Sequence, residues 1–88
     1  MVRCKVFTFL GMSDLYQGNA RDAIEHLQRA LQSPHQEAES LIRWYLAAAE
    51  WQLNQRQHVI DELQKITRMN DGFKAKAEET LKRLIEGR

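Results

Sequence analysis

Residues 10–31 read LGMSDLYQGNARDAIEHLQRAL, and this stretch decides the fold. Gly18 followed by Asn19 is typical of a tight turn, in which Gly18 ends one helix and the side chain of Asn19 can cap the next. After the turn, small and large apolar residues recur at helical spacing. The stretch therefore predicts two helices joined by a tight turn, the first over about residues 2–17 and the second over about 20–32.

A similar pattern recurs 36 residues later, in LAAAEWQLNQRQHVIDELQKIT at residues 46–67. The matched pairs are mostly apolar or small: Phe9 with Tyr45, Leu10 with Leu46, Gly11 with Ala47, Ala23 with Val59, Ile24 with Ile60, Leu27 with Leu63 and Ala30 with Ile66. Asn54 replaces Gly18, and we expect a left-handed backbone at both positions. The repeat predicts a second helical pair, over about residues 33–53 and 56–69.

Capping residues mark where the later helices begin. Ser33, Pro34 and Gln36 form a capping pattern for the third helix, and Asp71 can cap a fifth helix. The fifth helix is amphipathic, and the residues expected on its apolar side are Phe73, Ala77, Leu81, Leu84 and Ile85. The third helix is apolar around most of its circumference, so we expect it to lie between neighbours. The sequence thus predicts an all-α single domain over residues 1–88, with five helices and no strand.

These residues resemble the tetratricopeptide repeat family. The resemblance is carried by Leu10-Gly11 and then by Gly18, Ala23, Leu27 and Ala30, and it covers about residues 4–70. It implies a right-handed superhelix with repeat one at about 4–34, repeat two at about 37–70 and a closing helix at about 72–86 that looks like the cap of many bacterial arrays. The sequence departs from the family in its 36-residue offset, where 34 is usual, and in Asp14, where an aromatic residue is common.

Composition excludes several other classes of function. The chain is 43% hydrophobic with a net charge of +1, which is typical of a soluble globular protein and argues against nucleic-acid binding by charge. It contains no apolar stretch long enough to insert into a membrane. The lone Cys4 and the separated His26, His35 and His58 form no metal-ligand pattern, and we expect the histidines at the surface. We expect a cytoplasmic protein without metal or cofactor.

No catalytic constellation is visible in the sequence. Ser13 is adjacent to Asp14, but the spacing places no histidine to activate the hydroxyl. The carboxylates of Glu78 and Glu79 are neighbours in sequence, and such residues do not face one another on a helix. We therefore expect a binding protein and not an enzyme.

In the tetratricopeptide family, the first helix of each repeat lines a concave groove. The resemblance implies eight partner-binding positions here: Lys5, Thr8, Met12 and Leu15 from the first unit, and Leu41, Trp44, Ala48 and Trp51 from the second. The clamp of Lys and Asn side chains with which some members bind acidic tails is absent at Thr8 and Met12. Two interpretations of the tryptophans stay open: burial against helix one and the capping helix, or an apolar surface on which a partner docks.

The function favoured by these features is a protein–protein interaction module that binds a peptide or helix of a partner protein through its concave face. Alternatives are a secretion or assembly chaperone that shields a helical client, and a self-associating structural module. Val6, Phe7, Phe9 and Leu10 offer more apolar surface than one repeat can bury, so we expect a homodimer or a place in a longer repeat array.

Overall fold

The computed structural model describes residues 2–32, 39–69 and 72–86, with side chains from Val6 onward in the first helix. Within these ranges the chain forms five α-helices and no strand: α1 (Val2–Tyr16), α2 (Ala20–Leu31), α3 (Glu39–Gln52), α4 (Arg56–Thr67) and α5 (Lys74–Glu86). The prediction of an all-α, five-helix chain is confirmed. The capping residues predicted at Ser33, Pro34, Gln36 and Asp71 lie outside the described residues.

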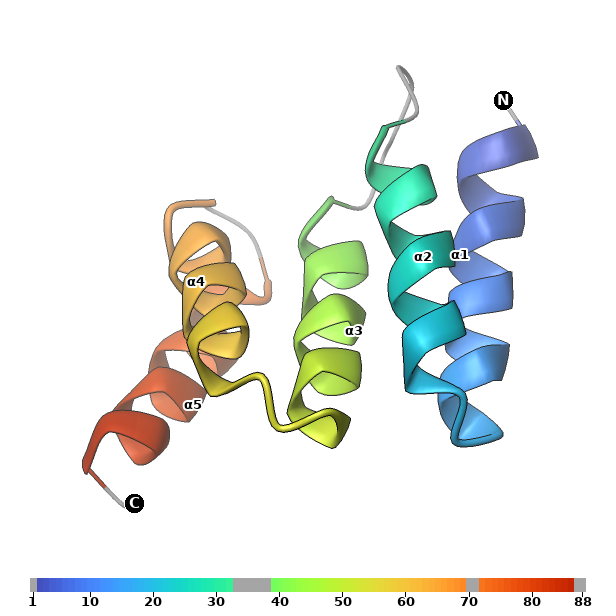
Figure 1. Cartoon of the computed structure of the whole chain (residues 1–88). Helices are drawn as coiled ribbons and strands as arrows, with labels where there is room; N and C mark the ends of the chain where they lie inside the picture. The colour runs from blue at the N-terminus through green and yellow to red at the C-terminus, as the bar shows by residue number, and fades with distance from the viewer. Residues whose placement is uncertain (1, 33–38, 70–71, 87–88) are drawn as a thin grey trace.

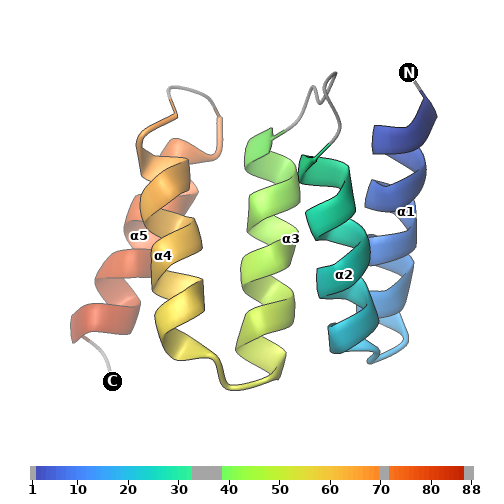
Figure 2. The ribbon, with the colours of Figure 1, turned by 45° about the horizontal axis from the view of Figure 1, so that its top comes forward.

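The helices pack in the order in which they occur along the chain. Each helix contacts the next one, and α1 also touches α3 (Figure 1). The result is a row of antiparallel helices that places the two ends of the chain at opposite ends of the molecule (Figure 2). The Cα trace measures 39 × 29 × 16 Å, so the molecule is a thin slab.

Two apolar clusters hold this row together. The first joins α2 to α1 and α3, and its buried members are Ala20, Ala23, Leu27, Ala30, Ile42, Leu46 and Ala49. The second joins α3, α4 and α5, and its buried members are Ala47, Val59, Leu63, Ile66 and Ala77. Alanine supplies many of these contacts because its small side chain lets helix axes approach closely.

The two tight turns have nearly the same geometry 36 residues apart. Gly18 has φ +83° and Asn54 has φ +60°, which confirms the left-handed conformation predicted at both. The N–H of Asn19 donates to the carbonyl of Asp14 at 2.7 Å, and the N–H of Gln55 donates to the carbonyl of Glu50 at 2.9 Å. The local chain path therefore depends on the left-handed residue, whichever of the two amino acids supplies it.

Two details of the sequence prediction were wrong. Asn19 precedes α2 as expected, but its side chain makes no capping hydrogen bond, because its ψ of 67° lies outside the extended region that a capping residue usually adopts. Ile85 is 62% exposed instead of packed, while the adjacent Leu84 packs against the second cluster. Successive helical residues point about 100° apart, so α4 covers one and leaves the other in solvent.

Candidate functional site

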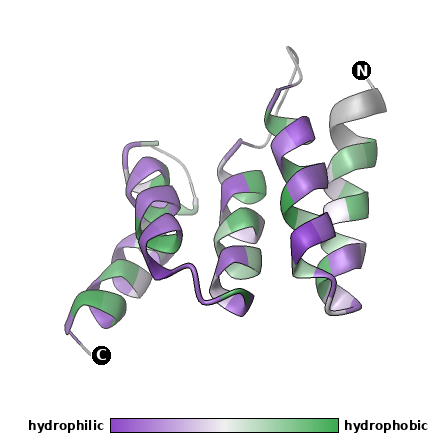
Figure 3. Ribbon diagram, viewed as in Figure 1, coloured by the Kyte–Doolittle hydropathy of each residue, from purple (hydrophilic) through white to green (hydrophobic). Residues whose placement is uncertain are grey.

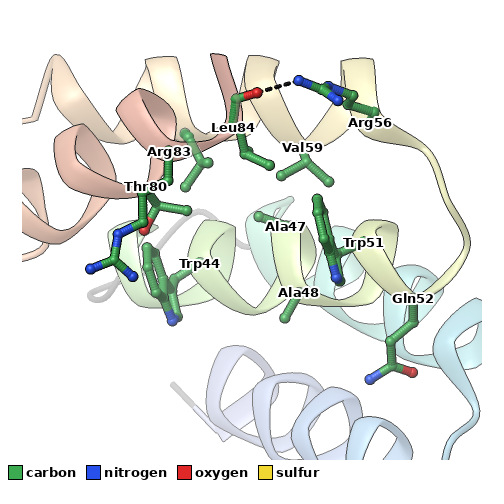
Figure 4. A pocket seen from close by; sticks show the side chains of 11 residues that line it. Trp44, Ala47, Ala48, Trp51, Gln52, Arg56, Val59, Thr80, Arg83 and Leu84 are labelled. Carbon is green, nitrogen blue, oxygen red and sulfur yellow. Dashed lines mark hydrogen bonds between the residues drawn. The ribbon is translucent and has the colours of Figure 1, made fainter. Parts of the chain in front are cut away.

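An apolar groove of about 630 Å³ opens between α3, α4 and α5. Alanines and tryptophans of α3 form one wall, and apolar side chains of α4 and α5 form the other (Figure 4). The lining residues are Trp44, Ala47, Ala48, Trp51, Gln52, Arg56, Val59, Leu63, Thr80, Arg83 and Leu84. This volume is in the range of about 300–1,000 Å³ that small-molecule pockets occupy, but the groove is open along one side.

The two tryptophans have different environments. Trp44 is half-buried, packs against the second cluster and lies with its ring centre 6.1 Å from that of Phe73. Trp51 is 55% exposed and borders the other end of the groove (Figure 4). Ala48, also exposed, lies between them on α3 and leaves the space between the two rings open. Trp44 is therefore partly a structural residue, whereas Trp51 exposes a large apolar ring to water.

Among the residues that the structure describes, two arginines and no acidic side chain line the groove. The Arg56 guanidinium donates a hydrogen bond to the carbonyl oxygen of Leu84, which ties α4 to α5 (Figure 4). Arg83 is paired with Glu79 at 3.1 Å on an exposed part of α5. Exposed pairs of this kind contribute little to stability and exchange readily with water. The mouth of the groove therefore favours a ligand that carries negative charge beside its apolar part.

The structure divides the eight predicted binding residues into two groups. Trp44, Ala48 and Trp51 meet in the groove. Leu41 is half-buried on α3 but does not line it. The α1 residues Thr8, Met12 and Leu15 are half-buried away from the groove, and Leu15 packs against the first cluster; the side chain of Lys5 lies outside the described residues.

Sequence reasoning missed the opposite wall of the groove. Thr80, Arg83 and Leu84 come from α5, which was predicted only as a closing helix. The Leu81–Leu84 spacing indicated an apolar side on this helix, and contact of the tryptophans with the capping helix was one of the two interpretations left open, but no residue of α5 was assigned to the binding surface. The site is thus built from α3 and α5, with α4 at its base, and not from α3 and α1.

A second polar feature links α1 to α2. His26 Nδ1 lies 2.6 Å from Asp14 Oδ2, and the imidazole stacks on Phe7 with ring centres 6.1 Å apart. The expectation that every histidine is a surface residue was wrong for His26, whose side chain is only 30% exposed. Ser13, the adjacent hydroxyl, accepts a hydrogen bond from Gln17 at 3.4 Å on the exposed side of α1. The pair joins two helices, and Ser13 is not part of it.

A third polar feature lies between α3 and α4. Glu50 is only 4% exposed, and its Oε1 has no hydrogen-bond partner. Burial raises the pKa of its carboxyl to about 7, and the negative charges of Glu62 and Asp61 also raise it, while Lys65 acts against them. Arg43 forms ion pairs with Glu62, at 2.9 Å, and with Glu39, at 2.8 Å.

Among the described residues, no group of three or more metal-ligating side chains comes together, and no helix has the length and apolar character needed to cross a membrane. Comparison with known protein families, with curated proteins and with solved structures finds no match to this chain. The groove and its exposed tryptophan are the features from which a function can be argued.

Proposed function

We propose that this chain is a protein–protein interaction module of the tetratricopeptide type, which binds an apolar helix or peptide of a partner protein in the groove between α3 and α5. The observation that carries the proposal is Trp51, which is 55% exposed at the edge of an apolar groove. Tryptophan is enriched among the residues that dominate binding energy, because one rigid ring buries a large area. A partner that covers Trp51 removes this apolar ring from water, and that burial favours binding.

The spacing of the tryptophans indicates the kind of ligand that fits. Trp44 and Trp51 are seven residues apart on α3, which corresponds to about 10.5 Å along a helix. Two apolar side chains of a partner helix that are two turns apart match that distance and can settle against Ala48 between the rings. Arg56 and Arg83 favour acidic residues beside these apolar anchors, since opposite charges across an interface steer association.

Selection from a library of displayed helical peptides on the purified chain tests the proposal. We expect the enriched peptides to carry two large apolar residues at a spacing of seven, with at least one Asp or Glu nearby. The affinity of one such peptide is then measured for the parent, for Trp51→Ala and for Tyr16→Ala. Tyr16 is the matched control, because it is an aromatic residue that is 86% exposed and lies outside the groove.

Trp51→Ala should weaken peptide binding by a factor of ten or more, because an interface hot spot contributes about 2 kcal/mol or more. Its melting temperature should stay near that of the parent, since Trp51 is largely exposed. Tyr16→Ala should bind normally. Selection that enriches no peptide, or peptides that bind the parent and Trp51→Ala equally, would contradict the proposal.

Trp44→Ala gives a second, different outcome. Because Trp44 contacts Phe73 and packs against the second cluster, its removal should lower both the affinity and the melting temperature. Tryptophan emission adds a direct readout: the exposed Trp51 should contribute red-shifted emission in the free chain that moves to the blue when the peptide binds. This result would separate docking at Trp51 from a change in fold stability.

A further inference from the structure

A row of exposed side chains on α1 faces away from the rest of the molecule. Phe9 is 69% exposed and Tyr16 is 86% exposed, while Gly11, on the opposite side of the helix, is buried against α2. Figure 3 shows apolar colours along much of α1, whereas the outward sides of α2 and α4 are hydrophilic. The exposed positions on this side of α1, which we call the α1 stripe, are Val6, Phe9, Leu10, Ser13 and Tyr16.

The α1 stripe carries no charge. Asp14 is the single charged residue of positions 6–17, and its carboxylate turns away from the stripe to contact His26 of α2 at 2.6 Å. The exposed positions of α2, by contrast, include Arg21, Asp22, Glu25 and Arg29. The open face of a helix usually carries such charged side chains. An uncharged face that exposes two aromatic rings is typical of a surface that another molecule covers.

The side of α3 that corresponds to the α1 stripe is closed. An offset of 36 residues relates Val6 to Ile42 and Leu10 to Leu46. Ile42 is 0% exposed and Leu46 is 1% exposed, because both belong to the cluster that α2 shares with α3. Within the described residues, no helix packs in that way against the α1 stripe. The pattern that α3 buries is therefore present on α1 without a cover.

The spacing of the stripe makes it complementary to itself. Four of its members follow one another at intervals of three, four and three, and so lie symmetrically about position 11: Val6, Phe9, Ser13 and Tyr16. When two such helices pack antiparallel about a two-fold axis at that position, Phe9 of each copy meets Ser13 of the other, and Val6 meets Tyr16. Large side chains then face smaller ones along the row, which fills the space between the helices. A parallel pair would instead set Phe9 against Phe9 and leave a gap between the two serines.

We propose that the α1 stripe is the interface of a two-fold dimer, in which two copies of this chain pair their α1 helices antiparallel. The occupant is a second copy because a two-fold axis brings the same surface to both sides of the interface, and an uncharged stripe meets no like charge when it is set against itself. One contact covers both stripes. The proposal rests on the exposure, charge and spacing of the stripe and is independent of the groove.

Other occupants fit the stripe less well. The far end of a second copy exposes charged residues of α5, which would have to be buried against apolar side chains: Glu78, Glu79, Lys82 and Arg83. The groove of a second copy is apolar, but a stripe docked there would leave one stripe uncovered and generate an open chain of molecules. Nothing in the described residues specifies the contact side of a helix from a different protein, whereas the symmetry of the stripe specifies its own partner.

The size of the stripe limits the strength of the dimer. Its largest contributors are Phe9 and Tyr16, and an aromatic side chain buries about 150–250 Å². The other stripe residues are smaller or already partly covered, so the two copies together bury less than the ~1,200 Å² at which stable specific interfaces begin. We therefore expect a reversible dimer that forms between about 10 µM and 1 mM of chain.

Sedimentation equilibrium over that concentration range measures the dimer dissociation constant of the parent and of three variants: Phe9→Glu, Tyr16→Glu and Ile85→Glu. Ile85 is the matched control, because it is an apolar residue that is 62% exposed on α5, away from the stripe. We expect Phe9→Glu and Tyr16→Glu each to raise the dissociation constant about tenfold or more, since each dimer loses the contact twice and buries two carboxylates. Ile85→Glu should leave it unchanged. All three variants should keep the parent's circular dichroism and monomer melting temperature, because these side chains are largely exposed.

Disulfide cross-linking tests the antiparallel register. Cys4 is first replaced by serine, so that Val6→Cys and Tyr16→Cys each introduce the only thiol of the chain. A mixture of these two variants should form a linked dimer faster than either one alone, because a disulfide requires Cα atoms within about 7 Å. A mixture of Val6→Cys with Ile85→Cys is the control and should link slowly. Faster linkage of Val6→Cys to itself would show parallel helices and overturn the arrangement.

Two further results would overturn the proposal. One is a parent chain that sediments as a monomer throughout the range, or a dimer that Phe9→Glu leaves intact. The other is a dimer that Trp51→Ala dissociates, because that result would place α1 in the groove of a second copy.

Discussion

Gly11 of α1 lies directly against Leu27 of α2: a methyl group at Gly11 would lie 2.5 Å from Cγ of Leu27 and 3.3 Å from the carbonyl oxygen of Ala23. Leu27 is fully buried in the first cluster. The absence of a side chain at position 11 is therefore what lets the two helices pack.

Gly11→Ala should lower the free energy of unfolding by about 1 kcal/mol or more. Overpacking a core costs about 1–3 kcal/mol, which outweighs the gain of about 1 kcal/mol in helix propensity from glycine to alanine. Gly72→Ala is the control, because it has no heavy atom within 4 Å of the new methyl group and no positive φ. Urea denaturation of both variants measures the difference. Equal stability of the two would show that α1 and α2 are less tightly packed than described.

The left-handed turns provide a second prediction. Gly18→Val should cost about 1 kcal/mol or more, because φ of +83° is strained for a β-branched residue even though nothing lies within 4 Å. Asn54→Gly should be neutral or slightly stabilising, since φ of +60° is natural for glycine. Thermal melting of the two variants compares them. If valine is tolerated at position 18 without loss, the turn does not constrain the pairing of α1 and α2.

The buried Glu50 predicts a stability that falls as pH rises. Its pKa is raised to about 7 in the folded chain from 4.5, so between these values the folded state binds more protons than the unfolded state. The stabilisation present below pH 4.5 is then lost as pH rises through 7, by up to about 3 kcal/mol at 1.36 kcal/mol per pKa unit.

Glu50→Gln removes this titration without removing the side chain. Urea denaturation at several pH values between 5 and 8 measures the free energy of unfolding of the parent and of Glu50→Gln. As pH rises, the free energy of unfolding of the parent should fall relative to that of Glu50→Gln. Comparing the two chains at each pH isolates the contribution of the Glu50 carboxyl. A difference that stays constant with pH would mean that Glu50 ionises in the folded chain as it does in water.

The sequence by itself determined the local features of this protein. Gly18 and Asn54 end helices because of the backbone conformations that they tolerate, and these conformations depend on few neighbours. The apolar spacing of Leu27 and Leu63 identified the buried sides of α2 and α4, since helical periodicity is a property of the chain alone.

Only the tertiary structure decided which helices meet and how each is rotated about its axis. The contact of His26 with Asp14, the burial of Glu50 and the exposure of Ile85 all depend on that rotation, because a small change turns a side chain from solvent into a neighbour. One wall of the groove could be predicted, because Trp44, Ala48 and Trp51 lie on one side of α3 at helical spacing. The opposite wall comes from α5, and its position depends on how α4 packs against both α3 and α5. Helix periodicity specifies which side of a helix is apolar, whereas the packing of whole helices determines what that side contacts.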